Sequence, residues 1–142
     1  MRAAIGGAVL ISAIFIAVAA RAETLHFHAR LSGAAEAPPN QSHGVGLAEL
    51  TLDTDIKLLS WRVTYSGLGG PVTGARFNAP PEPGATVMST MDFKQPLASP
   101  IIWSARLNDI QIGDLRAGLW SVNLLTARRP RGEIRGDLEQ GP

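Results

Sequence analysis

The stretch Leu25-His26-Phe27-His28-Ala29-Arg30-Leu31 decides the fold of this chain. Its side chains alternate strictly, with Leu, Phe, Ala and Leu at one set of positions and His, His and Arg at the other. This alternation predicts a β-strand that buries one face in a core and leaves the other face in water.

The same period-two pattern recurs along the rest of the chain. Ala48–Leu52 and Leu59–Tyr65 repeat it, and Asp53-Thr54-Asp55 between them is typical of a hairpin turn because Asp hydrogen-bonds its own turn backbone. One short helix is expected at Asp109–Arg116, with Gly118 placed to end it. Further strands are expected at Val72–Phe77, Ala85–Met88, Ile101–Leu107, Leu119–Leu125 and Glu133–Leu138.

Regularly spaced short strands with Gly- and Pro-rich turns between them predict an all-β domain. We expect an antiparallel β-sandwich, Greek-key and immunoglobulin-like or superoxide-dismutase-like, with at most one short helix. Residues 23–142 are long enough for one self-sufficient core, and no internal repeat divides them. The chain has no cysteine, so its stability must come from core burial without disulfides.

Residues 1–22 have the pattern of a signal peptide. A positive charge at Arg2 precedes the uncharged stretch Ala3–Ala20, and Ala20-Arg21-Ala22 places small residues where signal peptidase cleaves. Cleavage before Glu23 predicts export to the periplasm or the extracellular space. The alternative is a retained membrane anchor, because about 18 apolar residues lie at the lower limit for a bilayer span.

The charge balance argues against a nucleic-acid partner. Of 13 basic residues, cleavage removes Arg2 and Arg21, which leaves 11 against 12 acidic residues. A domain with a net charge near −1 has no general attraction for nucleic acid or for acidic membranes. Contact with a membrane is expected only through the N-terminal segment, if that segment is not cleaved.

Three short segments carry a family resemblance: Leu31-Ser32-Gly33-Ala34-Ala35-Glu36-Ala37-Pro38-Pro39, Tyr65-Ser66-Gly67-Leu68 and Gly132-Glu133-Ile134-Arg135-Gly136. In order and spacing they resemble the chordin-type (CHRD) domain, whose outline is LSGxxExPP, YxGL and GEIRG. The resemblance implies that residues 23–142 are a CHRD domain. Because the family occurs in extracellular multidomain proteins, it also implies an exported binding or interaction module.

The resemblance also implies a difference in metal binding. Related domains carry His-x-His and Asn-x-His-Thr segments, whose three imidazoles could form a metal site. The matching positions in this chain are Arg76, Asn78 and Leu125. Arg does not ligate metals and Leu is hydrocarbon, so we expect no metal and no other cofactor at this place.

The three histidines of this chain lie elsewhere. His26 and His28 share the polar face of the first predicted strand, and His43 follows in a loop. They could chelate a metal, but the alternative, a solvent-facing strand and an ordinary loop, needs no ligand. No acidic cluster nearby in sequence completes a ligand set.

Glu36 and Arg135 are candidates for a structural clasp. Glu36 is the single carboxylate of an otherwise apolar stretch, and Arg135 lies between Ile134 and Gly136 in a strand expected at the centre of the fold. Pairing would satisfy two groups that are costly to bury singly. The clasp would tie the first loop to the last strand. The alternative is a role for the pair in ligand binding.

Arg128, Arg129 and Arg131 are the remaining candidate for function. Pro130 favours a turn that projects all three guanidinium groups together, and Arg76 could join them. Such a patch would bind carboxylates, sulfates or acidic glycans. The alternative is a charged hairpin tip that keeps the loop soluble.

Two classes of function remain open. No Gly-x-Ser-x-Gly elbow, no cysteine nucleophile and no facing carboxylate pair indicates catalysis. The sequence therefore favours an exported, non-enzymatic binding module with an unknown protein or anionic glycan as partner. The alternative is a metal-dependent or redox enzyme on a superoxide-dismutase-like sandwich.

Overall fold

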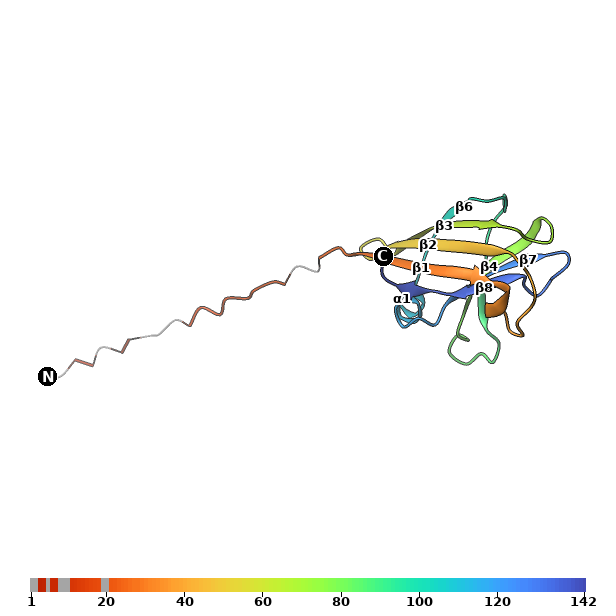
Figure 1. The fold of residues 1–142 in the computed structure, drawn as a ribbon. Helices are drawn as coiled ribbons and strands as arrows, with labels where there is room; N and C mark the ends of the chain where they lie inside the picture. Colours follow the sequence, from red (N-terminus) through yellow and green to blue (C-terminus); the bar gives the residue numbers. More distant parts are fainter. Residues whose placement is uncertain (1–2, 5, 8–10, 19–20) are drawn as a thin grey trace.

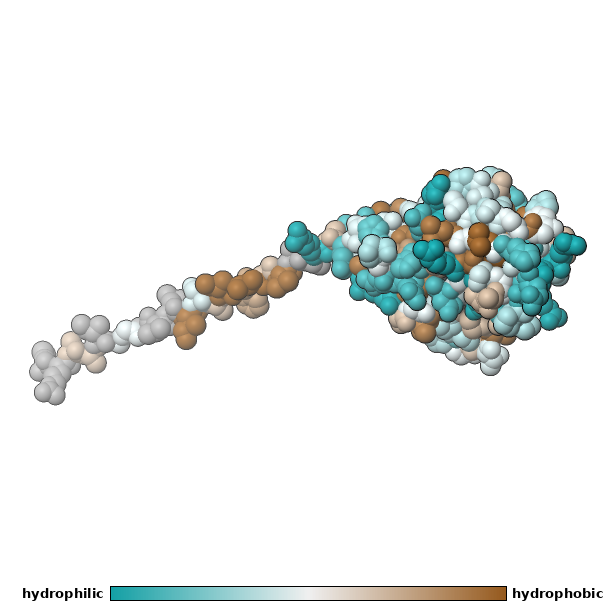
Figure 2. Space-filling model, in the orientation of Figure 1, coloured by the Kyte–Doolittle hydropathy of each residue, from teal (hydrophilic) through white to brown (hydrophobic). Residues whose placement is uncertain are grey.

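The computed structural model describes residues 3–4, 6–7, 11–18 and 21–142 (Figure 1). Residues 11–18 are neither helix nor strand, and their apolar side chains lie apart from the domain; Phe15, for example, is 95 % exposed (Figure 2). Within the described ranges, no helix is long and apolar enough to cross a membrane. The predicted cleavage site includes Ala20, which lies outside the described residues.

The elements follow one another in the order that the alternating sequence predicts, with short connections. In chain order they are β1 (Thr24–Ser32), η1 (Gly33–Ala35), β2 (Val45–Asp53), β3 (Leu58–Ser66), β4 (Val72–Ala79), β5 (Ser89–Asp92), β6 (Ile101–Arg106), α1 (Asp109–Arg116), β7 (Ser121–Thr126), β8 (Ile134–Asp137) and β9 (Glu139–Gln140).

In the described part of the chain, nine antiparallel strands form one hydrogen-bonded sheet, in the order β5-β4-β7-β8-β1-β2-β3-β6, with β9 beside β1. The sheet curls until its two halves face each other. Trp61 on β3 and Phe77 on β4, which are far apart in the strand order, bring their ring centroids within 5.0 Å. The all-β prediction is confirmed, and the two layers of the expected sandwich are two halves of this one curled sheet.

An aromatic cluster fills the space between the halves. The Phe77 ring makes edge contacts with the rings of Trp61 and Phe93. Its centroid lies 4.7 Å from that of Phe93 and 5.4 Å from that of Trp120. Each pair of this kind stabilises the fold by about 0.5–1.5 kcal/mol beyond area burial. The predicted apolar face of the first strand, from Leu25 to Leu31, joins this core with every member at most 6 % exposed.

The helix prediction is confirmed at Asp109–Arg116. Asn108 caps its start by accepting from the Gln111 N–H at 2.8 Å, and Gly118 follows its end with a positive φ of 75°. The predicted strand at Ala85–Met88 is wrong. Those residues are exposed after a turn at Gly84, and β5 instead forms where residues 89–92 pair with β4.

Candidate functional site

The three segments that carry the family resemblance meet at one end of the sheet. Ser32 of the first segment pairs with Arg135 of the third, and the side-chain amide of Asn40, directly after the first segment, donates to the backbone oxygen of Glu133 at 3.0 Å. A Cβ on Gly44 would collide with Leu68 and would lie 3.2 Å from Ile134. Three stretches far apart in sequence therefore pack on one another where β1 ends and β8 begins.

Glu133 is the hub of this end. Its side chain is 1 % exposed, and its two carboxylate oxygens accept from the Ser42 hydroxyl at 2.7 Å, the Thr126 hydroxyl at 2.8 Å and the Gly69 backbone N–H at 3.0 and 3.2 Å. Ser42 lies in the loop before β2, Gly69 lies in the loop after β3, and Thr126 is the last residue of β7. A buried carboxylate surrounded by donors in this way joins three segments that are far apart in sequence.

The same contacts decide the charge of Glu133. Burial by itself raises the pKa of this carboxyl, but the hydrogen bonds from Ser42, Gly69 and Thr126 and the positive charge of Arg129 together outweigh burial and hold its pKa below the ordinary value. Glu133 is therefore ionised in the folded protein at neutral pH.

Glu36 lies at the same end in a different environment. Its side chain is 8 % exposed, and its Oε1 atom has no hydrogen-bond partner. Burial raises the pKa of Glu36, while the Arg135 charge and the Ala37 backbone N–H lower it by less. Two buried carboxyl groups at one end of the domain are thus shifted in opposite directions.

Arg135 does not form the direct clasp with Glu36. Among the described residues, no ion pair within 4.0 Å joins them, although the Arg135 charge acts on Glu36. Instead, the backbone of Arg135 pairs with Ser32 of β1 and with Asn123 of β7. The tie between the first strand and the last hairpin is therefore made by strand pairing.

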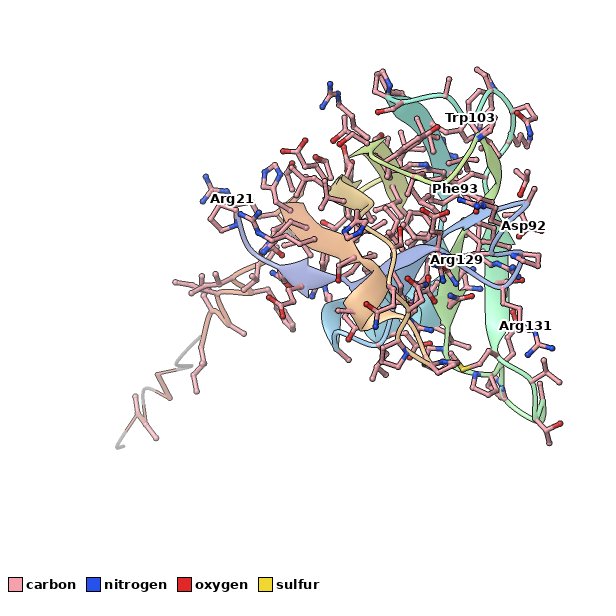
Figure 3. All side chains as sticks on the ribbon, turned by 45° about the vertical axis from the view of Figure 1, so that its right-hand side comes forward. Arg21, Asp92, Phe93, Trp103, Arg129 and Arg131 are labelled. Carbon is pink, nitrogen blue, oxygen red and sulfur yellow. The ribbon has the colours of Figure 1, made fainter. Side chains whose placement is uncertain are left out.

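The predicted basic loop, residues 128–131, connects β7 to β8 and is here named the arginine loop. Thr126 and Arg129 exchange backbone hydrogen bonds at 3.1 and 3.3 Å, and the Gly132 N–H donates to the Arg129 oxygen at 3.0 Å. Arg128 and Arg131 are exposed, whereas Arg129 is half-buried. Figure 3 shows Arg129 and Arg131 on the side of the domain away from Arg21.

Two hollows flank the arginine loop and share Arg129. The His43 hollow, about 490 Å³, is lined by Ser42, His43, Arg128, Arg129 and Glu133 together with Gln41, Gly67 and Gly69. The Glu36 hollow, about 340 Å³, is lined by Glu36, Arg129, Arg131 and Gly132 together with Ala37, Pro38, Pro39, Asn40 and Pro130. The loop thus contributes arginine residues to the lining of both recesses.

Arg76 is placed outside both recesses. It lies on β4, where its backbone pairs with Asp92 on one side and Asn123 on the other. Asn123 pairs in turn with Arg135, so Arg76 and Arg135 belong to one transverse row of the sheet. Arg76 therefore lines neither recess and shares a row of the sheet with Arg135.

The three positions that the family resemblance matches to histidine lie on two neighbouring strands of the sheet. Arg76 and Asn78 alternate with the core residues of β4, and Leu125 lies on the adjoining strand β7, paired with Gly74. Leu125 is thus a diagonal neighbour of Arg76, whereas Gly74, its partner on β4, lies four residues from Asn78, about 13 Å along the strand. The three positions carry a guanidinium, an amide and a hydrocarbon side chain.

The register separates the histidines of this chain. His26 and His28 lie on the outer face of β1, and His43 lies before β2, whose first residue pairs with Ser32 at the far end of β1. Two carboxylates distant from His28 in sequence, those of Glu49 and Glu139, lie opposite it on the neighbouring strands. Within the described residues, no group of three or more potential ligands is close enough to hold a metal ion.

Glu133 is a site residue that the sequence pattern did not single out. The sequence held no comparable signal, because Glu133 lies among Arg128, Arg129, Arg131 and Arg135 rather than in an apolar stretch such as the one around Glu36. The sequence also could not show which groups donate hydrogen bonds to Glu133, because only the fold brings Ser42, Gly69 and Thr126 together.

Comparison with known proteins supports the family. The family model of the CHRD domain matches residues 27–138, which include all three segments that meet at this end. No curated protein and no solved structure matches the chain. Family membership supports a binding module as the general class of function. The match covers well over half of the chain, which therefore belongs to the CHRD domain family.

Proposed function

We propose that this protein is an exported, non-enzymatic binding module of the periplasm or extracellular space that holds an anionic glycan at the arginine loop. The supporting observation is that Arg128 and Arg131 are exposed and that no ion pair within 4.0 Å in the described part of the chain includes either. Guanidinium groups bind carboxylates and sulfates with paired hydrogen bonds.

The two hollows make the loop suited to a chain rather than to a single small anion. Each hollow is lined by two arginine residues together with other polar residues, and Arg129 lines both. A polymer with repeated acidic groups would cross the loop and place one group in each hollow. This argues for a sulfated or carboxylated polysaccharide as the ligand class.

The position of the arginine loop relative to the N-terminal segment fits this role. The N-terminal segment enters β1 at Thr24, and the arginine loop lies at the opposite end of that strand, where Ser32 pairs with Arg135 (Figure 1). A nine-residue strand spans about 26 Å at 3.3 Å per step. If the exposed apolar segment at residues 11–18 is retained in a membrane, the arginine loop faces away from it.

The test is binding of residues 23–142 to heparin and to polygalacturonate, measured by calorimetry for the wild type and for Arg128→Ala/Arg131→Ala. Removing one charge-assisted hydrogen bond should weaken binding about tenfold or more, because such a bond contributes about 1.5–3 kcal/mol. Wild-type affinity should also fall as salt rises, since exposed charges are screened over about 10 Å at 0.1 M.

The matched control removes two exposed arginines elsewhere, Arg30→Ala/Arg62→Ala, with the same change in net charge. It should bind as the wild type does. If both double variants bind as tightly as the wild type, or if both lose the same affinity, the arginine loop is not the site.

A further inference from the structure

Two buried oxygen atoms at the arginine-loop end of the domain lack a donor. They are Oε1 of Glu36 and Oδ1 of Asn123, which have no hydrogen-bond partner although their residues are only 8 % and 5 % exposed. A buried polar atom left without a partner costs about 1–3 kcal/mol. Two of them at one place require an explanation.

Both oxygens converge on Gly132. A Cβ built on that residue would collide with Oδ1 of Asn123 and would lie 2.5 Å from Oε1 of Glu36, so both atoms crowd the same point. The amide of Asn123 is oriented by its other end, because Nδ2 donates to the backbone oxygen of Arg131 at 3.2 Å. Turning the amide over would set Oδ1 against that oxygen, so Oδ1 stays on the side of Glu36.

One proton resolves the conflict. An ionised carboxylate is an acceptor only, whereas a protonated one has an O–H that can donate. We propose that Glu36 is protonated in the folded protein and donates to Oδ1 of Asn123, and that this proton controls anion binding in the Glu36 hollow.

The charges around Glu36 oppose this state without overcoming it. The charge of Arg135 on β8 acts on Glu36, and Arg129 and Arg131 of the arginine loop line the same hollow. None of these forms an ion pair with Glu36 within 4.0 Å among the described residues. Burial outweighs the Arg135 charge, so the net direction of the Glu36 pKa is upward.

Glu133 shows that the environment decides the protonation state. Glu133 is even less exposed than Glu36 but accepts from three donor residues, and its pKa is lowered. Glu36 meets an acceptor where Glu133 meets donors. The negative charge of Glu133 is thus compensated, whereas a charge on Glu36 would face the Asn123 oxygen.

The proton has a consequence for the ligand, and this consequence rests on the proposed function. With Glu36 neutral, Arg129 and Arg131 give the Glu36 hollow a net positive charge. When Glu36 ionises, a carboxylate appears in the same recess and repels an anion. Binding of an acidic glycan should therefore weaken as the pH rises through the Glu36 pKa.

The proton itself is tested without any ligand, by carbon-13 NMR titration of the side-chain carboxyl groups in wild-type protein. Glu36 should titrate above 4.5, the ordinary pKa of a glutamate carboxyl. Assignment comes from the signal that disappears in Glu36→Gln, whose amide can still donate to Asn123. A titration midpoint for Glu36 at or below 4.5 would overturn the proposal, as would a bound metal ion between the two oxygens.

The binding arm compares heparin affinity of the wild type and Glu36→Gln at about pH 4.5 and about pH 8, on either side of a raised carboxyl pKa. The wild type should lose affinity several-fold more than the variant between these values, with Glu49→Gln as the control that behaves like the wild type. Equal loss in wild type and Glu36→Gln would refute control by Glu36. If neither the wild type nor any variant binds heparin at either pH, the proposed function is wrong. The NMR titration still tests whether Glu36 is protonated.

Discussion

The Ser42 hydroxyl donates a 2.7 Å hydrogen bond to Glu133, a residue 91 positions away in sequence. This bond joins the loop before β2 to the turn before β8. Together with the bonds from Gly69 and Thr126 to the same carboxylate, it assembles the end of the domain that carries the arginine loop. The candidate site therefore depends on one buried charge that no ligand needs to touch.

Glu133→Gln should destabilise the protein by about 1–3 kcal/mol, because the amide nitrogen replaces an acceptor with a donor that faces other donors. Urea unfolding at neutral pH measures the loss. Glu49→Gln is the control, since Glu49 is exposed and its oxygen lies 3.8 Å from Arg62; its effect should be about 0.5 kcal/mol or less. Equal losses would mean that the Glu133 network contributes nothing special.

The pH dependence of stability should reflect Glu133 and Glu36 with opposite signs. The lowered pKa of Glu133 stabilises the fold above its unfolded pKa, and this contribution is lost as the pH falls through the folded value. The raised pKa of Glu36 stabilises the fold below its unfolded pKa, and this contribution is lost as the pH rises through the folded value.

Urea unfolding at a series of pH values separates the two effects. Glu133→Gln should remove the loss of stability on the acid side, and Glu36→Gln should remove the loss above pH 4.5, where an ordinary glutamate is already ionised. Profiles that keep the wild-type shape in both variants would show that neither carboxyl is shifted by folding.

Gly132→Ala should cost about 2 kcal/mol or more, because it combines backbone strain with a steric clash. Gly132 has a φ of 139°, which L side chains rarely adopt, and the added methyl group would collide with Glu36 and Asn123. Thermal unfolding compares it with Gly70→Ala, an exposed glycine with nothing within 4 Å of the new Cβ. The control should stay within about 0.5 kcal/mol of the wild type. A tolerated Gly132→Ala would contradict the close approach at this residue.

Purified protein should contain no stoichiometric zinc or copper. Arg76, Asn78 and Leu125 stand at the positions that the family resemblance matches to histidine, and none of them is a good ligand for these ions. Elemental analysis of protein dialysed without chelator is the measurement. Roughly one equivalent of metal that disappears in His26→Ala/His28→Ala would instead support a site on β1 and the redox or metalloenzyme alternative.

Much of the fold could be predicted because it depends on local patterns. Strict alternation in β1, β2 and β3 specifies both the strand and its buried face, and the capping residues around Asp109–Arg116 specify a helix. The prediction of a strand at Ala85–Met88 was wrong because it too relied on a local pattern alone. A short apolar run has no intrinsic preference for a sheet, and pairing with β4 selected residues 89–92.

The amino-acid sequence by itself determined the strands, the helix and the three segments that mark a CHRD domain, because each depends on neighbours along the chain. The tertiary structure alone decided that Glu133 is charged, that Glu36 faces Asn123, and that Arg129 lies between two hollows. The reason is physical. The state of a buried polar group depends on which donors and acceptors surround it, and those partners come from distant segments that only the curled sheet brings together.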